Sequence, residues 1–144
     1  MKIVNPTNSY NLLLPDDVKE EYDKTVASFW REGNDLLLQL SSHQREKGNQ
    51  VEASERLKAK IESIGGEWKR YGLSLKENER FQTAGSFTKD ENGTVWLHMY
   101  ITWPDLMIYA TISGKSEGEV IKDNWAIDAV QKIKRVFLSN KNPV

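Results

Sequence analysis

Apolar residues in the first half of the chain recur at helical spacing. They follow one another every three or four positions from Val18 to Leu40, which is the spacing of one buried helix face. A proline and two carboxylates at positions 15–17 suit a first helical turn, because that turn exposes backbone N–H groups. Gly33 and Asn34 could kink or break this helix. The positions of this first stripe are Val18, Tyr22, Val26, Phe29 or Trp30, Leu36 or Leu37, and Leu40.

A second stripe of the same spacing follows a short polar connection at positions 47–49. It begins at Ala53 and continues beyond Gly65 and Gly66. Two helical stripes joined by a short connection predict an antiparallel, N-terminal helical hairpin. Two short apolar runs that precede both stripes, 3–4 and 12–14, each fit either a short strand or an extended arm. The positions of the second stripe are Ala53, Leu57, Ile61, Ile64, Trp68 and Tyr71.

The hydrophobic period changes from about 3.6 residues to 2 in the second half of the chain. Aliphatic residues alternate with polar and aromatic ones over 94–102 and again over 106–113. A two-residue loop at 104–105 would pair Ile101 with Ile108 and gather the aliphatic side chains on one face. The pattern therefore predicts two antiparallel strands with one buried face.

A further strand precedes these two, and its register depends on the loop that follows it. A three-residue loop at 90–92, with Gly93 as a bulge, would pair Phe87 with Val95 and Phe81 with Ile101. This register keeps the apolar residues of all three strands on the same face. The result is a three-stranded meander, with 120–121 as one more short extended piece.

The C-terminal part of the chain predicts one more helix. Asp123 or Asn124 could cap its first turn, and the helix would end near Asn140. Helices and strands are segregated along the chain, which favours an α+β fold over alternating βαβ units. We expect a single α+β domain over 1–144, with the N-terminal helical hairpin, a three- to four-stranded antiparallel β-meander and a C-terminal helix. The apolar stripe of that helix is Ala126, Val130, Ile133 and Phe137.

Composition narrows the function classes. The 144 residues are 38% hydrophobic and 28% charged, with a net charge of −1, so strong binding to nucleic acid is not expected. The absence of cysteine excludes disulfides and thiolate chemistry. No secretory signal is visible, and no apolar run reaches the ~20 residues that span a bilayer. We therefore expect a cytoplasmic protein that does not bind a membrane.

The predicted meander has one face rich in aromatic residues. It carries Trp96, His98 and Tyr100 on the central strand, Met107 and Tyr109 on a neighbouring strand, and Trp103 at the adjoining turn. A helix could cover this face, and the rings would then belong to a core. If the face is open, its composition is typical of protein-binding surfaces. These six residues are the predicted partner-binding site.

Catalytic signatures are absent. The sequence contains no H-E-x-x-H, glycine-rich phosphate loop or G-x-S-x-G motif, and it has only two histidines. His43 lies in a polar stretch and is expected to be solvated. His98 could act as a general base or bind a ligand, but no carboxylate shares its predicted face. We predict no catalytic residue, no metal site and no cofactor.

These observations favour a non-catalytic protein-binding module, in its most specific form a small inhibitor or immunity-type protein that blocks a partner protein. Two alternatives use the same face. One is a small-ligand-binding or enzymatic domain built on His98, Tyr100 and Tyr109, and the other is a structural homodimer that buries the face against a second copy.

Overall fold

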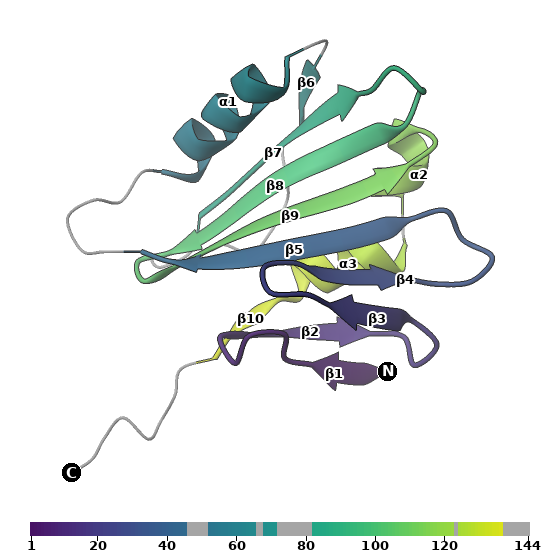
Figure 1. Cartoon of the computed structure of the whole chain (residues 1–144), viewed down its shortest axis with the longest axis vertical. Coiled ribbons are helices and arrows are strands. Elements are labelled where there is room, and N and C mark those ends of the chain that lie inside the picture. Colours follow the sequence, from purple (N-terminus) through teal and green to yellow (C-terminus); the bar gives the residue numbers. More distant parts are fainter. Residues whose placement is uncertain (46–51, 66–67, 72–81, 123, 137–144) are drawn as a thin grey trace.

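The computed structural model describes residues 1–45, 52–65, 68–71, 82–122 and 124–136, and it is built from two antiparallel sheets (Figure 1). The large sheet has seven strands in the order β3-β4-β5-β9-β8-β7-β6, and the small sheet has three in the order β1-β2-β10. The helices are α1 (Ala53–Ile64), α2 (Glu117–Ile121) and α3 (Trp125–Gln131). The strands are β1 (Lys2–Val4), β2 (Tyr10–Leu14), β3 (Lys19–Tyr22), β4 (Ala27–Trp30), β5 (Leu37–Gln44), β6 (Trp68–Tyr71), β7 (Gln82–Lys89), β8 (Val95–Trp103), β9 (Leu106–Gly114) and β10 (Lys134–Arg135).

The predicted helical hairpin is wrong, because the segment of the first apolar stripe folds into β3, β4 and β5. Burial there alternates with the period of a strand: Phe29 is buried between two partly exposed neighbours, and Leu38 and Leu40 are buried on either side of partly exposed Gln39. The two runs at 3–4 and 12–14 are strands too, within β1 and β2. Strands such as β3 and β4, of four residues each, are too short to show their own period, and their apolar residues together resemble a helical stripe.

Polar side chains at the turns explain where these strands end. The carboxylate Oδ1 of Asp23 accepts hydrogen bonds from the backbone N–H groups of Thr25 (2.9 Å) and Val26 (2.8 Å). Oδ1 of Asn34 accepts one from the N–H of Leu36 at 2.9 Å. Asx turns of this kind give the backbone an alternative to helical hydrogen bonding. They separate β3 from β4 and β4 from β5.

The second apolar stripe is a helix only over part of its length. α1 buries Ala53, Leu57 and Ile61, as the spacing predicted. It ends at Gly65, whose φ of 75° is a left-handed conformation and whose N–H donates to the carbonyl of Ile61. The chain then forms β6, so among the described elements no second helix stands beside α1 to form a hairpin. Positions 47–49 and Gly66 lie outside the described residues.

The meander formed by β7, β8 and β9 confirms the predicted arrangement of strands. Ile101 pairs with Ile108 across the two-residue turn, as predicted. The register of β7 differs from the predicted one by two residues, because Phe87 pairs with Leu97 and not with Val95. The loop occupies 91–93, and Gly93 has a φ of 82°. A shift of two residues leaves every side chain on its predicted face. The predicted partner Phe81 lies outside the described residues.

The C-terminal helix is shorter than predicted. α3 is capped by Asn124, whose Oδ1 accepts from the N–H of Ile127 at 2.8 Å, and it ends at Gln131. Its predicted continuation is β10, which pairs with β2. The piece at 120–121 belongs to α2 and is not extended. Positions 123, 137 and 140 lie outside the described residues.

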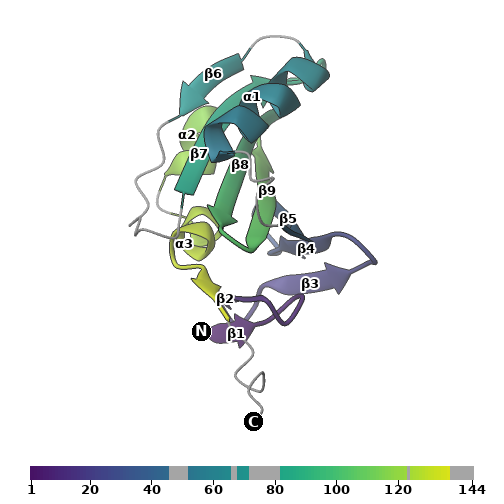
Figure 2. The ribbon, with the colours of Figure 1, turned by 90° about the vertical axis from the view of Figure 1, so that its left-hand side faces the viewer.

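The main core lies between the aliphatic face of the large sheet and a layer made by the small sheet, α2 and α3. α1 lies on the opposite face of the large sheet, where it packs on β7 and β8 (Figure 2).

Within the described residues, no helix is both long and apolar enough to cross a membrane. The cytoplasmic location stays a prediction, and so does the single-domain boundary.

We expect Ile112→Ala to lower the free energy of unfolding by about 2–5 kcal/mol, because Ile112 is fully buried in the main core. Ile64→Ala is the matched control: this isoleucine is 47% exposed at the end of α1, so its change should stay within about 0.5 kcal/mol. Urea denaturation of both variants measures the difference. Equal losses would contradict the described placement of the core.

Candidate functional site

Among the described residues, α1 covers about half of the width of the aromatic face of the meander. α1 packs on β7 and β8 and reaches the edge of β9, where the ammonium of Lys60 lies 4.8 Å from the ring centre of Tyr109. Among the described elements, the small sheet, α2 and α3 all belong to the other face. Within the part of the chain that the structure describes, both arrangements considered for this face therefore occur, one half covered and one half open.

Two predicted site residues lie beneath α1. Tyr100 packs in a small apolar cluster with Ala53, Leu57 and Ile61, and it is only 7% exposed. His98 is 5% exposed on the same strand. Neither side chain offers much surface to a partner, and Tyr100 instead helps to hold α1 on the sheet.

Both ring nitrogens of His98 have hydrogen-bond partners. Nε2 lies 2.8 Å from the hydroxyl of Thr88, and Nδ1 lies 2.6 Å from the hydroxyl of Tyr109. The Tyr109 and His98 rings are also stacked, with centres 6.1 Å apart. Thr88 takes this position because of the two-residue shift of β7, which also sets Ser86 opposite His98. The histidine therefore links β7 to β9 across the central strand.

Electrostatics keep this histidine neutral. Burial, helped by the positive charge of Lys60, lowers the pKa of His98 from 6.5 to about 4. Burial also raises the pKa of Tyr109, with a smaller contribution from Tyr100. A neutral imidazole between two hydroxyls donates one hydrogen bond and accepts another. With such a low pKa it is a weak base, which argues against general-base catalysis by His98.

Trp103 lies beside the turn, as predicted, but its side chain is not on the aromatic face. Its side chain lies on the aliphatic face with Leu97 and Ile101, belongs to the main core and is 6% exposed. Trp103 has the same strand parity as these residues, so the alternation of side chains along β8 places it on their side of the sheet. It cannot belong to the same surface as Trp96.

The other three predicted residues, Trp96, Met107 and Tyr109, are partly exposed. Trp96 is held in place by a hydrogen bond of 3.1 Å from its indole Nε1 to the carboxylate of Asp90. The ring centres of Tyr109 and Tyr100 are 4.9 Å apart, within the range of favourable aromatic pairs. These three side chains form the accessible part of the predicted site, and Trp96 and Tyr109 are held by hydrogen bonds.

Sequence reasoning missed the part of the face that β4 and β5 contribute. Trp30 pairs with Leu37, Leu37 with Ser113 and Ser113 with Trp96, so one row of side chains crosses four strands. Ser113 is buried between its larger neighbours. The alternation of Leu37, Gln39 and Ser41 with buried leucines was the available signal, but it was assigned to a helix. We call the combined surface the open sheet face and define it as Trp30, Leu37, Gln39, Trp96, Met107 and Tyr109.

The six residues that define the open sheet face are uncharged, although 28% of the chain is charged. Charges border it, because the ammonium of Lys60 lies over Tyr109 and the carboxylate of Asp90 accepts the hydrogen bond of Trp96. The open sheet face offers three aromatic rings, two flexible apolar side chains and one amide, which is held by a hydrogen bond of 3.2 Å from Gln39 to Ser28. In the part of the chain that the structure describes, no group of three or more His, Asp or Glu side chains could hold a metal ion. The chemistry of this surface is that of contact and hydrogen bonding.

Comparisons with known proteins support the fold and leave the function open. No family model matches the chain, and no curated protein matches it significantly. A crystal structure from Bacteroides thetaiotaomicron VPI-5482, solved at 1.50 Å, is similar over 96% of this chain with a TM-score of 0.56 and 12% identity. The match spans only 49% of that longer chain. A likeness at this identity shows a shared fold alone.

The low pKa of His98 predicts a pH-dependent stability. Between its ordinary pKa of 6.5 and about 4, the unfolded chain binds a proton that the folded chain excludes. The contribution of neutral His98 to the free energy of unfolding is therefore fully present above pH 6.5. It is lost as the pH falls through this window, by a total on the order of 3 kcal/mol. We expect His98→Gln to show a correspondingly shallower loss of stability between pH 6.5 and 4. Parallel slopes in denaturation series of the two proteins would contradict this account.

Proposed function

We propose that the chain is a non-catalytic protein-binding module and that the open sheet face is its recognition surface. One observation carries the proposal: six uncharged, partly exposed side chains from four strands are collected on a face that α1 leaves half uncovered. Trp, Tyr and Met are enriched in protein interfaces, and charged residues are depleted at interface centres. The surface has both properties.

The rigidity of this surface favours binding. Three of its side chains are held by hydrogen bonds: Trp96 to Asp90, Tyr109 to His98 and Gln39 to Ser28. Side chains that are already ordered lose little conformational entropy when a partner arrives. More of the binding free energy is then available for affinity.

The open area also has a suitable width. Packed helices lie about 8–10 Å apart, which is close to the width of two strands at about 4.8 Å each. α1 occupies β7 and β8, and β9 and β5 are the next two strands in the sheet. One further helical segment, supplied by a partner protein, would fit beside α1.

The more specific role, a small inhibitor or immunity-type protein that blocks its partner, has only the size of the chain in its favour. The enzymatic alternative loses support, because both nitrogens of its central residue, His98, already have partners. A homodimer would use the same surface and is an outcome of the test below.

The test compares bait proteins in lysate of the native host. Leu37→Glu places a charge at the centre of the open sheet face, whereas Ile3→Glu places one at a residue that is 69% exposed on β1. We expect one protein to be retained by the natural chain and by Ile3→Glu, but at least tenfold less by Leu37→Glu. The same ratio should appear in the Kd for the purified protein, because a tenfold change is about 1.4 kcal/mol of binding free energy.

Thermal melts must first show that both variants are folded. Retention of the same protein by all three baits would overturn the proposal, and so would the absence of any retained protein at low salt. Light scattering completes the design: a dimer of the natural chain that Leu37→Glu dissociates would assign the surface to self-association instead.

A further inference from the structure

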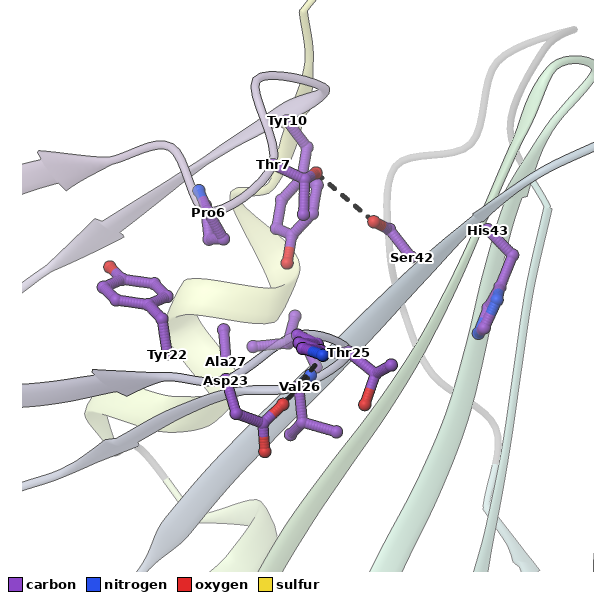
Figure 3. A pocket seen from close by; sticks show the side chains of 12 residues that line it. Pro6, Thr7, Tyr10, Tyr22, Asp23, Thr25, Val26, Ala27, Ser42 and His43 are labelled. Atoms are coloured by element: carbon purple, nitrogen blue, oxygen red, sulfur yellow. Dashed lines mark hydrogen bonds between the residues drawn. The ribbon is translucent and has the colours of Figure 1, made fainter.

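A second site lies on the other side of the large sheet, at one end of the space between the two sheets. It is a pocket of about 210 Å³ (Figure 3). The loop before β2, the turn between β3 and β4, and β5 enclose it. Its walls include Pro6, Thr7, Tyr10, Tyr22, Thr25 and Ser42. None of these residues belongs to the open sheet face.

Tyr10 gives this pocket an unsatisfied polar group. Its side chain is 0% exposed, and its hydroxyl is buried without a hydrogen-bond partner among the described residues. The ring reaches down into the space between Ser42 and Tyr22 with the hydroxyl at its tip (Figure 3). A buried hydroxyl without a partner is unfavourable for folding. A ligand that supplies the missing hydrogen bond would remove that penalty.

Several other polar groups around the pocket are engaged in hydrogen bonds. The hydroxyls of Thr7 and Ser42 are 3.3 Å apart and can also bond to a ligand, because each hydroxyl has one donor and two acceptor sites. The hydroxyl of Tyr22 donates to the carboxylate of Glu20 at 3.2 Å. The two tyrosines therefore differ. The hydroxyl of Tyr22 has a hydrogen-bond partner, whereas the hydroxyl of Tyr10 has none among the described residues.

The pocket favours a ligand without net charge. Its lining also includes Asp23, Lys24 and His43, and the opposite charges of Asp23 and Lys24 offset each other. Burial, with a smaller contribution from Tyr22, raises the pKa of Tyr10, so its hydroxyl stays protonated and brings no charge to the depth of the pocket. Burying a charged ligand without a paired charge would cost much free energy. The volume is below the ~300 Å³ of sites for drug-sized molecules. A single ring with several hydroxyl groups fits both limits.

We propose that this pocket binds a monosaccharide-sized, uncharged polyol ring. One ligand hydroxyl bonds to Tyr10, and another bonds to the Thr7–Ser42 pair. The ring of Tyr22 and the side chain of Pro6 supply the apolar wall against which the C–H face of such a ring packs. This function is independent of the open sheet face, and its failure would leave the proposed protein-binding role unchanged.

The experiment titrates the ¹⁵N-labelled protein with D-glucose, D-galactose, D-mannose and N-acetyl-D-glucosamine, each up to high millimolar concentration. We expect at least one of these sugars to shift the amide signals of Thr7, Tyr10 and Ser42 in a saturable manner. Tyr10→Phe should weaken that binding about tenfold, because it removes one hydrogen bond and keeps the ring. Ile64→Ala, at the end of α1 on the opposite face of the large sheet, is the control and should change the affinity less than twofold.

Thermal stability separates a ligand site from a structural hydroxyl. We expect Tyr10→Phe to melt at the same temperature as the natural protein or higher, because it removes a buried group that has no partner. A marked fall in melting temperature would give that hydroxyl an internal role and overturn the proposal. Sugars that shift no signal of the pocket would overturn it too, with water as the remaining occupant, and so would equal binding by the Tyr10→Phe variant.

Discussion

The antiparallel pairing of β5 with β9 is the contact on which both proposed binding surfaces depend. It joins the N-terminal strands to the meander, with Leu38 opposite Ile112 and Leu40 opposite Ala110 in the main core. Successive residues of β5 then point to opposite faces. Leu37 and Gln39 enter the open sheet face, whereas Leu40 and Ser42 line the pocket on the other side. A slip of one residue would exchange the two sets.

The meander could be predicted from the sequence because its evidence is local. Two long runs of strict alternation meet at a two-residue turn, and the requirement that Ile101 and Ile108 share a buried face fixes their register. The loop before β8 was harder, since Gly93 fits a bulge in more than one position. Even there, the side chains were assigned to the correct faces.

The N-terminal half could not be predicted in the same way. β3 and β4 have four residues each, too few to establish a period, and Asp23 and Asn34 resemble the polar face of a helix until their backbone partners are known. The pairing of β5 with β9 is distant in sequence and leaves no local pattern. The half of the candidate site that β4 and β5 contribute was therefore missing from the prediction. The depth at which His98 is buried could not be inferred either.

Paired cysteines test the register of β5 and β9 most directly, because the natural chain has no cysteine. Gln39 lies opposite Thr111, so Gln39→Cys with Thr111→Cys should oxidise rapidly to one intramolecular disulfide, visible by mass and gel mobility. Gln39→Cys with Ala110→Cys, one residue out of step and on opposite faces, should not. The reverse result would contradict the pairing, and with it the composition of both surfaces.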